Sequence, residues 1–334
     1  MRSGDEIAVR LLTPEEAPLL TALIRRCYGE TYLDRSFYDE GAVVELLASA
    51  RLHSIGAFSV AGLLVGHMGI TMRAHGGITA DAGMTLVHPD FRGRGIARRV
   101  AIGLAQQSIE LGLVGVHDYP VTVHAATQRI GAGFGVDTGL LLANVPGDVV
   151  FEQMQTVTTE FRTNSLIRWL PFGPAPSRRV YLPDRYQEQI QALYTQAHLD
   201  RAVSLSREHL GEHGSELESR YDARRQTLRV TVKRACRDLC GKLQREMRIA
   251  ESGGGLLVHV DLGLCDPTTP RAAEALRDLD FSFAGLLPEY HDGDVLRMQW
   301  LAKSVSTVVR SVVSSDSTQA IVAFVLGDRQ PRTG

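Results

Sequence analysis

The sequence predicts an α/β protein of two domains, and three observations support this prediction. The chain has 334 residues, and one domain typically holds about 100–200. Strand-like and helix-like segments alternate over residues 6–142. A similar order of elements returns at 256–288. We therefore expect one domain over 1–146, a linker or crossover with strand-like pieces over 147–183, and a second domain over 184–328.

The composition excludes several classes of protein. Hydrophobic residues make up 44% of the chain and charged residues 22%, which is ordinary for a globular protein. A net charge of −2 argues against a nucleic-acid partner. The apolar runs are shorter than the roughly 20 residues of a membrane span, and the N-terminus lacks the hydrophobic region of a signal peptide. We expect a soluble, cytoplasmic protein with no membrane partner.

Cysteine, histidine and lysine usage also narrows the chemistry. The four cysteines contain no CxxC pair, so we expect free thiols. His209 and His213 have a spacing that could suit a metal, but no third ligand is evident, and we expect no metal. The first lysine is Lys233, which excludes a Walker A loop or a Schiff-base lysine before it.

The elements of the first domain follow from local signals. Thr13 with Glu16 three residues later is a capping-box pattern that begins a helix. Ala61-Gly62 is a tight turn between two strands. In order, we expect a strand at 6–12, helices at 14–26 and 41–51, strands at 53–60, 63–75 and 81–87, a helix at 95–111, a strand at 116–124, a short helix at 125–132 and a strand at 134–142.

The second domain repeats part of this order. We expect a helix at 186–199, a strand pair at 217–233, a helix at 236–249, a strand at 256–262, a helix at 270–279, and strands at 281–287 and 295–300. The sequence at 256–288 has the same strand, helix, turn and strand as 120–141, although few residues match. The repeat predicts two related domains. Four prolines over 171–183 favour an ordered linker between them.

One stretch carries chemistry: the sequence RGRGIA at 92–97, between an expected strand and an expected helix. Its glycines let backbone N–H groups converge, and a helix N-terminus adds unpaired donors, so the loop suits a pyrophosphate. A dinucleotide-binding loop would need glycine where Arg98 stands. A plain structural turn and a coenzyme A loop are the other two interpretations.

The pattern Arg92-x-x-Gly95-x-Ala97 resembles the [Q/R]-x-x-G-x-[G/A] signature of the GNAT superfamily of acyl-CoA N-acyltransferases. The element order over 6–142 and the Gly133-Phe134 pair are similar to that family as well. The resemblance implies acetyl-CoA as co-substrate. The residues that it assigns to the coenzyme are Leu86, Val87, Arg92, Gly93, Arg94, Gly95, Ile96, Ala97 and Arg98.

The second domain resembles a degenerate GNAT half without a pyrophosphate loop, since no glycine precedes Gly241 in the corresponding segment. We expect that it binds no coenzyme A. It either walls the substrate pocket or forms an oligomer interface, which would make the protein a homodimer.

The resemblance also implies catalytic residues. A free amine would attack the thioester carbonyl, with a backbone N–H near Leu86 or Val87 as the oxyanion donor. Asp81 is our first choice of general base, and His88 and His124 are alternatives. Arg129 stands where the family usually has a tyrosine that protonates the thiolate. Either Tyr119 serves instead, or the thiolate leaves without a dedicated acid.

The acceptor side is less defined. Tyr28, Tyr32 and Tyr38 lie in the loop that covers the acceptor in GNAT folds, and an aromatic lid suits an apolar or amphipathic amine. The leading hypothesis is N-acetylation of a small-molecule primary amine. A coenzyme A-responsive regulatory protein and an aminoacyl-tRNA-dependent transferase are the alternatives.

Overall fold

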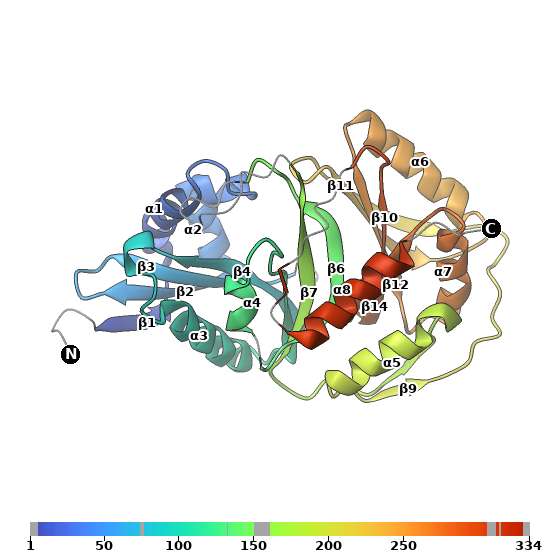
Figure 1. Ribbon diagram of the computed structural model, residues 1–334, viewed down its shortest axis with the longest axis horizontal. Coiled ribbons are helices and arrows are strands. Elements are labelled where there is room, and N and C mark those ends of the chain that lie inside the picture. Colours follow the sequence, from blue (N-terminus) through green and yellow to red (C-terminus); the bar gives the residue numbers. More distant parts are fainter. Residues whose placement is uncertain are drawn as a thin grey trace.

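One mixed β-sheet crosses the whole molecule and holds both halves of the chain (Figure 1). The computed structural model describes residues 6–73, 77–131, 133–149, 161–305, 312–313 and 315–329. Within them the sheet has twelve strands in the order β1-β2-β3-β4-β5-β7-β6-β13-β14-β12-β11-β10, and β8 pairs with β9 separately. The first half lies at one end of the sheet and the second half at the other.

The first half is an α/β layer structure with helices on both faces of the sheet. Its elements are β1 (Ile7–Leu11), α1 (Ala17–Tyr28), α2 (Glu40–Ala48), β2 (Leu52–Ser59), β3 (Leu64–Thr71), β4 (Thr79–Val87), α3 (Ile96–Glu110), β5 (Gly115–Asp118), α4 (Ala126–Ile130), β6 (Val136–Val145) and β7 (Thr163–Pro171). The expected capping box of Thr13 and Glu16 is present. Helix α1 packs on one face of β3 and β4, and α3 covers the other.

The second half repeats the topology of the first. Its elements are β8 (Arg178–Val180), α5 (Gln187–Gln196), β9 (Arg201–Val203), β10 (Glu216–Asp222), β11 (Thr227–Arg234), α6 (Leu239–Ser252), β12 (Leu257–Gly263), α7 (Thr269–Arg277), β13 (Ser282–His291), β14 (Gly293–Leu301) and α8 (Asp316–Asp328). The run β11-α6-β12-α7-β13-β14 matches β4-α3-β5-α4-β6-β7. In each run the first two strands of the chain order are parallel neighbours in the sheet. The fourth strand of the chain order lies in the sheet between the second and the third. The expected repeat of element order is confirmed.

The halves join where β6 and β13 cross, at the register pair Gly139 and Gly285. A Cβ built on Gly139 would lie 2.2 Å from the carbonyl oxygen of Ala284, and one on Gly285 would lie 2.9 Å from the Gly139 Cα. Only glycine allows this approach of two backbones. Helix α8 packs on both strands across the junction (Figure 1).

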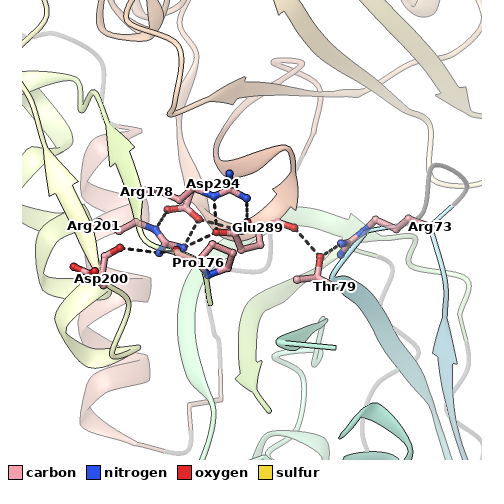
Figure 2. A network of polar contacts seen from close by, with 8 residues as sticks. All are labelled: Arg73, Thr79, Pro176, Arg178, Asp200, Arg201, Glu289 and Asp294. Atoms are coloured by element: carbon pink, nitrogen blue, oxygen red, sulfur yellow. Dashed lines mark hydrogen bonds and ion pairs between the residues drawn. The ribbon is translucent and has the colours of Figure 1, made fainter. Parts of the chain in front are cut away.

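A second contact between the halves is polar (Figure 2). The hydroxyl of Thr79, the first residue of β4, donates to the backbone carbonyl of Glu289 on β13 at 2.7 Å. The Glu289 carboxylate in turn accepts from Arg178 at 2.7 Å and from Arg201 at 2.9 Å, and Arg201 also pairs with Asp294 at 2.6 Å. These buried charges are mutually paired, so the second half holds the start of β4 in place.

The structure differs from the expected order of elements in three places. Residues 147–183 contain β7, a buried strand between β5 and β6, because the run NSLIRWL is apolar enough to lie inside a sheet. The expected strand at 116–124 ends at Asp118, since Pro120 has no N–H for a ladder. Helix α8 was not expected from the sequence. The division into domains at 146 and 184 stays an interpretation.

Candidate active site

A pocket of about 330 Å³ opens where the end of β4 meets the start of α3. The C-terminus of α1 and helix α4 complete its walls. The lining residues are Cys27, Tyr28, Thr85, Leu86, Val87, Phe91, Arg92, Gly93, Gly95, Ile96, Ala97, Ala126, Thr127 and Ile130. Seven of the nine residues expected to contact coenzyme A are in this set. Arg94 and Arg98 are outside it, and the guanidinium of Arg94 lies over the Phe91 ring at 4.9 Å.

The glycine loop has the backbone that an anion site needs. Gly93 has φ +75° and Gly95 has φ +72°, a left-handed region that favours glycine. Gly95 is the N-cap of α3, and its carbonyl accepts from the N–H of Arg99. The N–H groups of the first turn therefore point toward the pocket end of the helix without helical partners. Such a terminus attracts negative charge.

Strands β4 and β5 separate beside the pocket. They pair in parallel from Thr79–Asp81 to Gly115–His117 and no further. Strand β4 continues for six residues, to Val87, and its last three line the pocket. Beyond Asp81, the backbone N–H and C=O groups on the β5 side of β4 are not paired with β5. An extended ligand can therefore form hydrogen bonds with them.

A β-bulge precedes the pocket-lining end of β4. The register passes from Gly69 opposite Gly83 to His67 opposite Leu86, which leaves Met84 and Thr85 against one residue of β3. Met84 has φ +53°, rare for a residue with a side chain. The Nδ1–H of His67 donates to the Met84 carbonyl at 3.0 Å, and Nε2 contacts the Ser54 hydroxyl. Burial lowers the pKa of His67 to about 4, so the ring is neutral at pH 7.

The structure brings Asp81 and Tyr119 together at the point where β4 and β5 separate. The Tyr119 hydroxyl donates to the Asp81 carboxylate at 3.4 Å, and Arg73 pairs with the same carboxylate at 2.8 Å. Arg73 lies 4.0 Å from the centre of the Tyr290 ring, which comes from the second half. Burial, and then the negative Asp81, raise the pKa of the Tyr119 phenol, which keeps it protonated. Neither residue lines the pocket.

His124 lies in the loop between β5 and α4. The strand expected over 116–124 would have ended at His124, but β5 ends six residues earlier. Burial lowers the pKa of His124, and its backbone carbonyl accepts from Gln128 at 3.1 Å. His88 caps the short 3₁₀ helix at Pro89–Phe91, where its side chain accepts from the Asp90 N–H.

The aromatic loop forms one cluster next to α1. The rings of Tyr28 and Tyr32 are 5.0 Å apart, and those of Tyr32 and Phe37 are 6.0 Å apart. The hydroxyl of Tyr38 accepts from the Tyr32 N–H at 2.9 Å. Tyr28 lines the pocket, whereas Tyr32 and Tyr38 pack against the core on the α1 side.

One titratable residue was missed by the sequence analysis. Asp118 ends β5 and lines a cavity of about 10 Å³ with Thr85, Thr127 and Ile130, which also line the main pocket. Burial raises the pKa of Asp118 to about 6. Strand alternation from the buried Val116 could have placed this side chain on the inner face.

Among the described residues, no group of three or more His, Cys, Asp and Glu side chains is arranged to hold a metal ion. Over the same residues, every helix is too short or too polar to cross a bilayer.

Comparison with solved structures finds similarity to proteins described as acetyltransferases over part of the chain. One match is the GNAT family N-acetyltransferase YhbS from Escherichia coli in complex with CoA, with 21% identity and a TM-score of 0.31 over 37% of this chain and 67% of that one. Another is the putative acetyltransferase yncA from Salmonella typhimurium with acetyl-CoA, with 12% identity and a TM-score of 0.40 over 51% and 96%. A third is the ribosomal-protein-S18-alanine N-acetyltransferase from E. coli, with 15% identity and a TM-score of 0.39 over 51% and 97%.

No family model and no curated protein matches the sequence. In fold, the chain is a mixed α/β protein whose second half repeats part of the element order of the first.

Proposed function

We propose that this chain is an acetyl-CoA-dependent N-acyltransferase that acts on a small-molecule primary amine. One observation carries the proposal: the unpaired end of β4 and the glycine-rich start of α3 share one pocket. A long molecule with a diphosphate at one end and amide groups along its arm matches both features. Coenzyme A has that chemistry.

The loop residues supply the diphosphate contacts. Arg92 and the first residues of α3 after Gly95 line the pocket. Hydrogen bonds to a charged group contribute roughly 1.5–3 kcal/mol each, so several of them would hold a diphosphate firmly. Arg98 and Arg99 are mostly exposed on the same helix and add positive charge nearby.

The strand geometry selects one oxyanion donor. The His88 N–H donates to Val65 on β3, and N–H directions alternate along a paired strand. The N–H of Leu86 therefore points toward β3, and that of Val87 points to the open side. We assign the oxyanion contact to Val87. Removal of such a donor typically costs roughly 10²–10³ in rate.

Asp81 is the proposed base for the amine, and the hydroxyl of Tyr119 donates to its carboxylate. Both stand where β4 and β5 separate. The ion pair with Arg73 competes for the Asp81 carboxylate, and this observation favours the second candidate function, a coenzyme A-binding protein without catalysis.

Thiol release from acetyl-CoA distinguishes the two. The purified chain is incubated with acetyl-CoA and a panel of spermidine, glucosamine and a peptide with a free N-terminal alanine. Amine-dependent release of coenzyme A supports the acyltransferase. Tight binding of coenzyme A in calorimetry with no release for any amine supports the binding protein, and no binding refutes both.

A further inference from the structure

A carboxyl group lies at the point where β4 and β5 separate. The last register pair is Asp81 with His117, so Asp118 is the first residue of β5 beyond the paired region. Its side chain lies on the face opposite to that of His117, because side chains alternate along a strand. That face is covered by α3 and α4.

The cavity beside Asp118 adjoins the main pocket. Thr85 on β4 and Thr127 and Ile130 on α4 line both spaces. Asp118 therefore shares its cavity with three residues that also line the main pocket, Thr85, Thr127 and Ile130. On the proposed function, the thioester sulfur at the end of the coenzyme A arm lies in the main pocket beside these residues.

Few groups compete for this carboxyl. Its Oδ1 accepts from the N–H of Tyr119 at 2.9 Å. Across the sheet, Arg168 on β7 is its register partner, but that guanidinium pairs with Asp137 on β6 at 2.6 Å and donates to the Gln128 carbonyl. From α3 and α4, the cavity receives Ala101, Leu104, Thr127 and Ile130, none of which carries a charge.

We propose that Asp118 is the proton donor to the departing thiolate of coenzyme A. The proposal rests on the proposed function. The amine nitrogen bonds to the acyl carbon, the C–S bond breaks with its electron pair going to sulfur, and the carboxyl proton of Asp118 moves to sulfur. Asp81 takes up the proton that the amine loses, and proton exchange with water returns Asp81 and Asp118 to their starting states, so the products are an amide and a thiol.

The environment suits this task. An acid is most effective when its pKa lies near the working pH, because a useful fraction is then protonated. Burial raises the pKa of Asp118 from the ordinary range to about 6, and the nearby Asp137 adds to the rise, while Arg168 and the Tyr119 N–H oppose it. Arg129, on the exposed side of α4, does not line this cavity.

Asp118→Asn tests the proposal, because it keeps the size of the side chain and removes its proton. With an amine that the wild type accepts from the panel above, we expect kcat to fall about 10²-fold, with the affinity for coenzyme A unchanged. The wild-type kcat should fall as pH rises and the carboxyl group ionises, and the variant should lack this alkaline limb. Thr127→Val alters the same cavity without removing an acid, and it should keep that limb.

Stability separates a functional role from a structural one. A buried carboxylate is unfavourable when ionised, so Asp118→Asn should raise the Tm at pH 8. A lower kcat together with a higher Tm supports the proposal. A lower Tm with weaker coenzyme A binding shows a packing role and overturns it.

Two further results also overturn the proposal. One is an unchanged kcat and pH profile in Asp118→Asn. The other is loss of the alkaline limb in Tyr119→Phe instead, which moves the proton donor to the opposite face. In both cases the wild type still turns over, so the proposed function stands. A wild type that binds coenzyme A and releases no thiol refutes the function and this inference together.

Discussion

The two halves share an order of elements, but the pairing of two corresponding parallel strands differs between them. In the first half, β4 and β5 pair over three register positions and then separate. In the second half, β11 and β12 stay paired over six positions, Thr227–Val232 with Leu257–Leu262. A gap opens only in the first half, and the pocket lies beside it. Element order alone therefore does not create a ligand cleft.

The helix that follows each strand differs as well. Helix α3 begins at a glycine with positive φ and leaves its first N–H groups to the pocket. At α6 the N-cap is Asp238, whose carboxylate accepts from the hydroxyl and N–H of Ser215 and from the N–H of Gly214. These hydrogen bonds lower the pKa of Asp238, so a negative charge stands where a phosphate would bind. On the proposed function, a carboxylate that pairs with Lys242 thus stands at the helix start that a phosphate would need in the second half.

The largest effect is expected at the glycine loop. Gly95→Glu puts a side chain and a negative charge into the anion site, and calorimetry should show coenzyme A binding lost. Gly112→Glu is the matched control, since Gly112 also has positive φ and open surroundings but lies at the other end of α3. Equal affinity in the two folded variants would contradict the assignment of the loop.

We expect a substitution at the junction of the halves to lower the stability of the protein strongly. Gly139→Ala puts a methyl group against the Ala284 carbonyl, and we expect the free energy of unfolding to fall by about 3 kcal/mol. Gly263→Ala, at the end of β12, has open space and should change little. Denaturant titration measures both variants. A single transition that shifts as a whole would show that the halves unfold together, and two separate transitions would show independent domains.

Asp81→Ala should lower kcat about 10²-fold, with little change in the KM for acetyl-CoA, because Asp81 lies outside the pocket. Steady-state rates over a range of pH check this. A variant with the wild-type pH–rate profile would remove Asp81 from the mechanism.

The smallest effect is expected from His67. Its pKa is about 4 in the folded chain and near 6.5 when unfolded, so its contribution to stability is present above pH 6.5 and is lost as pH falls toward 4. Between pH 7 and pH 5 the loss is about 2 kcal/mol. The wild type should lose this stability on acidification, and His67→Gln should not. The exposed His213→Gln serves as control, and an identical acid response in all three proteins would refute the role of His67 at the bulge.

The local sequence determined much of the first half. RGRGIA at 92–97 has glycines at two positions of positive φ. The segment His88–Asp90 interrupts the pattern between the strand and the helix, so the loop and the helix could be placed from the nearby sequence. The alternation of strands and helices also predicted the repeat in the second half. These features depend on residues close in sequence, where propensity and periodicity act directly.

Tertiary structure alone decided the features that join distant segments. Strand β7 enters the sheet between β5 and β6 because its apolar residues are buried on both faces, and its partner strands cannot be read from its own sequence. Arg73 contacts the Tyr290 ring only because β13 lies beside β6 in the sheet. Burial raises the pKa of Asp118, and the residues around it come from β3, β4, α3, α4 and β7. Desolvation and charge pairing depend on distances in space, so these properties arise only once the sheet is assembled.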